Sequence, residues 1–188
     1  RSGDQRQLKS GLRNYTHKGL GGARRAAQRM GGTAKTAGIL FGALHAIRTQ
    51  VADPSIALDV ARLRGLSVGG IADRIIDAVR PANGTQDAEA NRQSIANAIK
   101  DVLDQDPSAD LLSLTSEQIE MVIELYVAYD LRQRIELDVG GAVLNAAPSV
   151  AEGMRRLQVM MIYIRESVSA CFRHLRTHGQ PFTRSVAA

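Results

Sequence analysis

A run of glycine, lysine and threonine at residues 31–36 is the first pattern in this sequence that could do chemistry. It reads Gly-Gly-Thr-Ala-Lys-Thr, and in phosphate-binding loops a Lys-Thr pair after glycines holds phosphates and magnesium. Two requirements fail, because Ala34 stands where a glycine should precede Lys35, and residues 24–30 are a basic helical sequence instead of a buried strand. The pattern favours a helix with small residues for close packing over a nucleotide site.

Residues that ligate metals or attack substrates are present without the partners that such sites need. His174 and His178 are one helical turn apart, but arginines flank them and no third ligand is evident. Cys171 falls on the apolar side of a predicted helix, which indicates a buried structural thiol, and no serine has a nucleophile-elbow sequence around it. Four aspartates around Pro107 are more typical of a solvated acidic edge than of a calcium loop. We expect no catalytic residues, no metal and no cofactor, and hence no enzyme.

Basic residues near the start of the chain are the candidate binding residues. Residues 1–50 hold ten Lys and Arg against one acidic residue, whereas residues 51–130 hold six basic residues against fourteen acidic ones. Such polarity fits nucleic acid, an acidic partner protein, or pairing between the two parts of the chain. Aromatic side chains that could stack on bases are scarce in this region, which disfavours sequence-specific binding of single-stranded nucleic acid. The predicted partner-binding residues are Lys18, Arg24, Arg25, Arg29 and Lys35.

Helices must position these residues, because composition and periodicity indicate an all-α fold. The chain has 188 residues, of which 44% are apolar but only seven are aromatic, so we expect an aliphatic, alanine-rich core typical of packed helices. The predicted architecture is a single-domain bundle of six to seven helices. Its parts are a basic helix with a Gly-rich hinge (residues 1–22), the bundle (residues 23–178) and a C-terminal tail (residues 179–188). No apolar run is long enough to span a membrane, and the lone cysteine fits a cytoplasmic protein.

Caps and spacing place the main helices. A short helix is expected from Pro54 to Gly65, and Ser67 should cap the next. Residues 115–118 (Thr-Ser-Glu-Gln) form a capping box that opens a central buried helix, which Gly140 and Gly141 should end or kink. The last long helix should start at Pro148. Its apolar seam alternates by four and three, typical of a bundle seam or a two-chain coiled coil, and consists of Val150, Met154, Leu157, Met161, Ile164, Val168, Cys171 and Leu175.

Four stretches together resemble the QatB family, the B component of Qat anti-phage defence systems. They are residues 18–38, 80–89, 111–140 and 164–170, in the family's order and spread over most of the chain. In that family the B protein is encoded beside an ATPase, a QueC-like enzyme and a TatD-like nuclease. The resemblance implies a binding partner and client of the QueC-like protein, with the ATPase and the nuclease as further candidate partners.

The resemblance also implies a modification, the attachment of a deazapurine to the N-terminus of the B protein through an amide bond. This chain opens at Arg1 without a methionine, so we expect the natural N-terminus, and with it the modification site, to lie outside it. Two rival functions remain at this point: a nucleic-acid-binding accessory protein that uses the basic region, and a structural subunit that dimerises through the last helix. Membrane binding is not expected.

Overall fold

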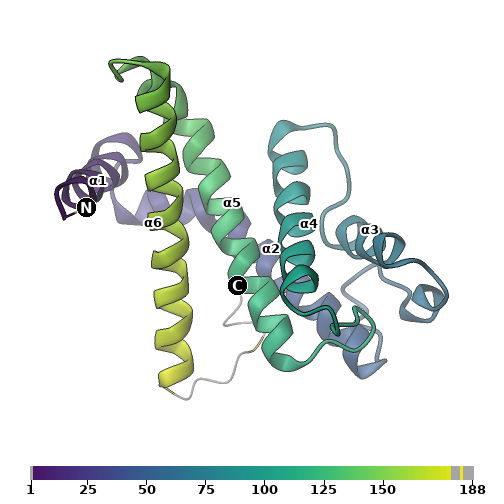
Figure 1. Cartoon of the computed structure of the whole chain (residues 1–188). Helices are drawn as coiled ribbons and strands as arrows, with labels where there is room; N and C mark the ends of the chain where they lie inside the picture. Colours follow the sequence, from purple (N-terminus) through teal and green to yellow (C-terminus); the bar gives the residue numbers. More distant parts are fainter. Residues whose placement is uncertain (1, 179–182, 184–188) are drawn as a thin grey trace.

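The computed structural model describes residues 2–178 and 183, and all regular secondary structure there is helical (Figure 1). The order is α1 (Ser2–Asn14), η1 (Tyr15–Gly19, a π-helix), α2 (Ala23–Thr49), η2 (Val60–Leu63, a 3₁₀ turn), α3 (Val68–Val79), α4 (Gln86–Gln105), α5 (Ser116–Asn145) and α6 (Val150–Thr177). The predicted all-α bundle is therefore confirmed, with six α-helices in the described residues. The predicted tail, residues 179–188, lies outside the described residues except for Thr183.

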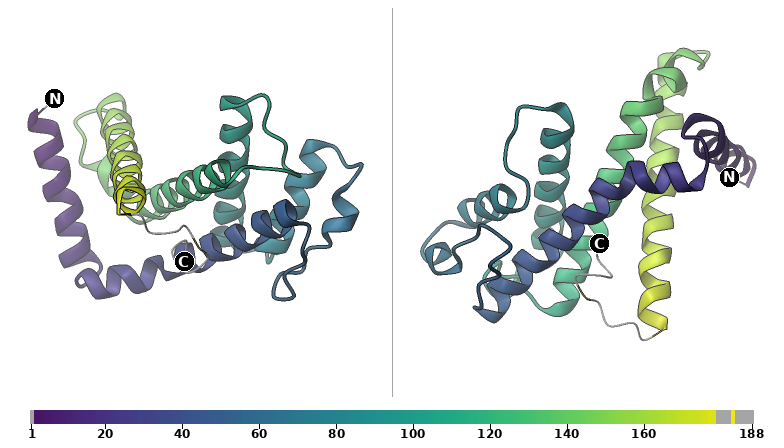
Figure 2. Two further views of the ribbon diagram at one scale, coloured as in Figure 1. Left: turned by 90° about the horizontal axis from the view of Figure 1, so that it is seen from below. Right: turned by 180° about the vertical axis from the view of Figure 1, so that it is seen from behind.

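Helix α5 is the centre of the molecule, as its apolar sequence predicts. It packs against α4 on one side and α6 on the other, while α2 crosses behind it (Figures 1 and 2). The largest fully buried side chains of this main core are aliphatic apart from Tyr126, and they include Leu40, Ile95 and Ile123. Burying an aliphatic side chain of this size stabilises the fold by about 1.5–3 kcal/mol. The main core thus fixes the second half of α2 against α3 and α5.

A second, smaller apolar cluster joins α6 to the C-terminal half of α5. Its buried members are Leu157, Met160 and Ile164 of α6. Leu12 of α1 packs on the same cluster, together with side chains of α5 such as Ile135 and Val139. Among the side chains of α1 that the structure describes, Leu12 therefore packs on a satellite of the core and none belongs to the main core.

The side-chain caps expected from the sequence are present. The amide of Gly70 donates to the Ser67 hydroxyl over 3.1 Å, and in the capping box of α5 the amide of Gln118 donates to the Thr115 hydroxyl over 3.2 Å. The Gln118 side chain in turn accepts from the Thr115 amide over 2.8 Å. Each cap satisfies an amide that would otherwise lack a partner in the first turn.

Two predicted helix boundaries are wrong. The helix expected from Pro54 to Gly65 is only the single 3₁₀ turn η2. The Asp53 side chain accepts hydrogen bonds from the amide and hydroxyl of Ser55 in a local turn, and the Asp59 side chain accepts from the amide of Ala61 at the start of η2. Helix α5 does not end at Gly140 but runs to Asn145. Gly140 and Gly141 keep helical backbone there. A pair of glycines weakens a helix without ending it where the helix packs on a neighbour.

The predicted seam of α6 is correct only in its middle. Leu157, Ile164 and Val168 are buried, but Val150, Met154 and Cys171 are exposed, so the prediction of a buried thiol is wrong. From Met160 onward the buried positions advance by four residues at each step, ending at Phe172, whereas the prediction alternated threes and fours. The seam faces α5 of the same chain, which accounts for it without a second chain.

Candidate partner-binding site

The five cations predicted to bind a partner lie along an elbow between α1 and α2. Lys18 is near the end of η1, Arg24, Arg25 and Arg29 lie in the first two turns of α2, and Lys35 is further along it. All five are exposed, and Arg29, whose side chain is 49% exposed, is also ion-paired with Asp138. Residues 24 and 35 are separated by three helical turns, so both project from the same side of α2, about 16 Å apart along its axis.

The elbow itself depends on glycine. Gly21 and Gly22 have φ values of 74° and 107°, in a region that side chains with a Cβ rarely adopt. A Cβ on Gly21 would also come within 2.9 Å of the Arg25 guanidinium. The preceding π-helix is a rare backbone form that occurs often at functional sites. Glycines that interrupt the basic sequence therefore turn α1 sharply away from α2 (Figure 2).

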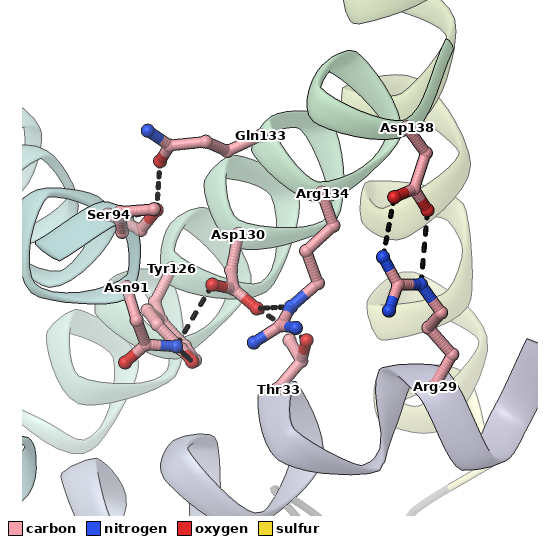
Figure 3. Close-up of polar contacts among 10 residues, drawn as sticks. Arg29, Thr33, Asn91, Ser94, Tyr126, Asp130, Gln133, Arg134 and Asp138 are labelled. Carbon is pink, nitrogen blue, oxygen red and sulfur yellow. Dashed lines mark hydrogen bonds and ion pairs between the residues drawn. The ribbon is translucent and has the colours of Figure 1, made fainter. Parts of the chain in front are cut away.

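Arg29 holds this elbow to α5 (Figure 3). Its Nη2 lies 2.5 Å from Oδ1 of Asp138 and its Nε donates to Oδ2 over 3.1 Å, a two-point pairing. The Tyr15 hydroxyl donates to the same carboxylate over 2.5 Å. We call these three residues, Tyr15, Arg29 and Asp138, the elbow clasp. It joins η1, α2 and α5 at one point.

The elbow clasp changes the pKa values of its acid and its phenol. The hydrogen bond from Arg29 holds the pKa of Asp138 below its usual range. Burial, followed by the hydrogen bond to Asp138, raises the pKa of Tyr15 to about 12. The clasp is therefore complete when Asp138 is ionised and Tyr15 is neutral, which is the ordinary state at neutral pH.

A second polar cluster lies two turns back along α5, inside the molecule (Figure 3). Asp130 is only 2% exposed, and its Oδ2 accepts from the Thr33 hydroxyl and, over 2.8 Å, from Arg134. Its Oδ1 accepts from Asn91 over 2.9 Å, and the same amide also donates to the Tyr126 hydroxyl over 2.7 Å. We call these five residues the buried network. It connects α2, α4 and α5.

The buried network is built to hold helices and not to meet a substrate. Both oxygens of Asp130 are occupied by donors of the chain, and Asn91 and Tyr126 are at most 1% exposed. Burial, and then the charge of Asp130, raises the pKa of Tyr126 above its ordinary value, so this phenol stays protonated. Asn91 Oδ1 is the one buried side-chain atom of the cluster without a hydrogen-bond partner in the described residues. The remaining contacts fix the relative positions of the helices that contribute to the cluster.

Sequence reasoning missed both aspartates. Asp130 and Asp138 stand in a helix whose other inward positions are apolar, and Arg134 follows Asp130 at i+4. An acid in such a setting is a signal for a paired buried charge. Its partners in α2 and α4 are distant in sequence and carry no local signal.

The weaker candidates from the sequence have structural explanations. Residues 31–36 lie within α2, where Thr33 and Thr36 are buried and Lys35 is exposed, so they form no phosphate loop. The ring centroids of His174 and His178 are 4.0 Å apart, and Nδ1 of His178 lies 2.8 Å from the His174 carbonyl oxygen. Among the described residues no group of three or more His, Cys, Asp or Glu is arranged to hold a metal. Within the same part of the chain, no helix combines the length and apolarity needed to cross a bilayer.

These features define an α-helical bundle with enclosed polar contacts and a displayed basic elbow. A family model described as "Qat anti-phage system associated protein QatB" matches residues 21–187, and the chain belongs to this family. It is thus a component of an anti-phage defence system. No curated protein and no solved structure matches the chain.

Proposed function

We propose that this chain is the non-enzymatic binding partner and modification client of the QueC-like enzyme of its Qat system, acting in the cytoplasm. Membership of the QatB family supports a role inside that system. The enclosed state of the buried network supports a binding role over a catalytic one. The observation that carries the proposal is the basic elbow, where Lys18, Arg24, Arg25 and Lys35 are all exposed.

The elbow is suited to meeting a protein partner. Exposed cations steer an acidic partner and raise the rate of association more than the final affinity. Arg29 has a different role in this proposal, because its charge is already paired with Asp138. We therefore assign contact to the four exposed cations, and to Arg29 the task of holding the elbow in place.

The arm at residues 1–22 would carry the modified terminus toward the enzyme. Helix α1 extends from the elbow away from the main core (Figure 2), and its described contact with the apolar interior is Leu12. In the proposed division, residues 23–178 form the recognition body and the arm presents the terminus. Such an arm leaves the end of the chain within reach of an active site in the bound partner.

Co-expression of the full-length protein with the QueC-like protein of its system tests this function. We expect the two to co-purify, and we expect intact-mass analysis to show a mass increase that peptide mapping confines to the N-terminal peptide. The matched control is the same protein expressed without that gene, which should keep the unmodified mass. An unmodified terminus with no co-purifying partner would contradict the proposal.

Nucleic-acid binding is the second candidate, because Arg24 and Lys35 share one side of α2. Two or more phosphate contacts would make duplex binding steeply dependent on salt. Measurement of DNA affinity between 50 and 200 mM salt, roughly the range over which such binding weakens strongly, distinguishes this candidate. Tight, salt-sensitive DNA binding without a protein partner would favour it.

A further inference from the structure

A groove separates α1 from the hairpin of α5 and α6. It encloses about 540 Å³, a volume within the range of ligand and peptide sites. Gly11 forms part of one wall, and a Cβ added there would meet nothing within 4 Å. The rest of the lining comes from α5, the residue that follows it, and α6: Val139, Ala142, Val143, Ala146, Glu152, Arg155, Arg156, Val159 and Met160.

The floor of the groove is apolar and carries small side chains. Ala142 and Ala146, one helical turn apart, are exposed to solvent along the groove. Val139 and Val143 continue the same surface toward the second apolar cluster, where they pack on its buried members. Small residues spaced by one turn let the backbone of another helix approach closely. The floor therefore offers a surface on which another helix can lie closely.

The rim of the groove is positive. Glu152 is the only acidic residue between positions 139 and 160, and it accepts from two arginines, Arg155 over 2.8 and 3.0 Å and Arg156 over 2.9 Å. These hydrogen bonds, first from Arg155 and then from Arg156, lower the pKa of Glu152 to about 2, so it stays ionised. Among the residues that line the groove, the charged side chains are these two arginines and one glutamate, an excess of one positive charge.

We propose that this groove binds an acidic amphipathic helix of a partner protein. The apolar face of that helix would lie on the alanine and valine floor, and its carboxylates would lie toward the arginines of the rim. This inference deepens the proposed partner-binding function and rests on it for the existence of a partner, but it places the contact at the groove. The elbow would then steer the partner and the groove would hold it.

Binding of a defined peptide tests the groove without the natural partner. The probe is a labelled helical peptide of Leu, Ala and Glu, about 18 residues or five turns long, with leucines at i, i+3, i+4 and i+7. Fluorescence anisotropy with the full-length protein should show saturable binding. A peptide with each Glu replaced by Lys should bind at least about tenfold more weakly, since like charges then meet at the rim.

Two exposed alanines give a matched pair of variants. Ala142→Glu places a like charge and extra bulk on the floor, and should weaken binding of the acidic peptide at least about tenfold. Ala170→Glu makes the same change at an exposed position of α6 outside the groove, and should bind like the parent. Circular dichroism melts of both variants should match the parent, because both sites are exposed.

Several outcomes would overturn the inference. These are no binding of the acidic peptide, equal binding of its Lys counterpart, or equal losses in the two alanine variants. Binding of anionic phospholipid vesicles or duplex DNA that Ala142→Glu abolishes, with no peptide binding, would assign the groove to another class of ligand. The QueC-like complex and its mass increase are measured separately, so failure of the groove and failure of the proposed function can be told apart.

Discussion

Two aspartates of α5 pair with neighbouring helices by the same chemistry in different surroundings. Asp130 does so in the interior of the bundle, and Asp138 does so at the elbow between α1 and α2. Each accepts from an arginine and from a hydroxyl, Arg134 and Thr33 in one case and Arg29 and Tyr15 in the other. The side chains of Asp130 and Arg134 are 2% and 18% exposed, whereas those of Asp138 and Arg29 are 19% and 49% exposed. Water screens the second pairing more than the first, so similar contacts differ in strength.

This difference separates a stable helical body from the N-terminal arm (residues 1–22), which has few buried contacts. The main core and the buried network fix α2, α4 and α5, while Leu12 and the elbow clasp join the arm to α5 and α6. Segments with few buried contacts open at low free energy, and binding regions are drawn from them. The proposed binding elements, the elbow and the groove, both lie at the lightly held end.

The largest expected effect comes from removing the buried acid. Asp130→Ala should lower the free energy of unfolding by about 3–5 kcal/mol, because it leaves Arg134, Asn91 and Thr33 without their shared acceptor. Urea unfolding followed by circular dichroism measures it. Asp138→Ala is the matched control, and equal losses in the two variants would remove the distinction between the regions.

Truncation in the second apolar cluster should have the next largest effect. Leu157→Ala should cost about 2–3 kcal/mol, the lower part of the range for buried leucines, because this cluster is small. Leu40→Ala in the main core should cost more, since Leu40 is fully buried. Thermal or urea melts give both values, and a reversed order would show that α6 is held as firmly as the body.

A smaller global effect with a clear local one is expected for the elbow clasp. Asp138→Ala should change the free energy of unfolding by about 1 kcal/mol or less, as for other exposed ion pairs. Amide hydrogen exchange in residues 1–22 should nevertheless become faster, while exchange in α4 stays as in the parent. Unchanged exchange in the arm would mean that the elbow clasp does not hold it.

The smallest expected effect is the dependence of the elbow clasp on pH. The pKa of Asp138 in the folded protein is lowered, so its contribution is present above the unfolded value of about 4 and is lost as the pH falls below it. The pKa of Tyr15 is raised to about 12, so its contribution is complete below about pH 10 and is lost as the pH rises through 12.

Phenolate absorbance checks the alkaline side of this window. The difference between the titrations of the parent and of Tyr15→Phe isolates Tyr15, which should ionise near pH 12. In Asp138→Ala this midpoint should shift toward 10, since the acceptor of its hydrogen bond is gone. A midpoint that stays near 12 in that variant would assign the shift to burial alone.

The sequence predicts local features of this fold well. The capping box at Thr115 and the cap at Ser67 depend on residues three apart, and both are as expected. The all-α class follows from periodicity over whole helices. The ends of helices are less predictable. At Gly140 packing overrides the local signal, and after Asp53 a turn held by side-chain hydrogen bonds replaces the expected helix.

The candidate site was predictable only in part. The exposure of Lys18, Arg24, Arg25 and Lys35 follows from their charge. The pairing of Arg29 with Asp138 spans 109 positions and depends on how α2 crosses α5, which the sequence does not display. The groove depends on the direction in which the glycine elbow turns α1, and this is likewise a property of the assembled fold.

The most direct test is the affinity of the full-length protein for the QueC-like protein that we propose as its partner. Reversing two exposed elbow cations, Arg24→Glu with Arg25→Glu, should slow association and so weaken the complex at least about tenfold through lost charge complementarity, with the melting temperature unchanged. The control reverses Arg62 and Arg74, two exposed arginines that line a pocket beside α3, and should leave the affinity close to that of the parent. A complex equally tight in the elbow variant and in the control would contradict the account.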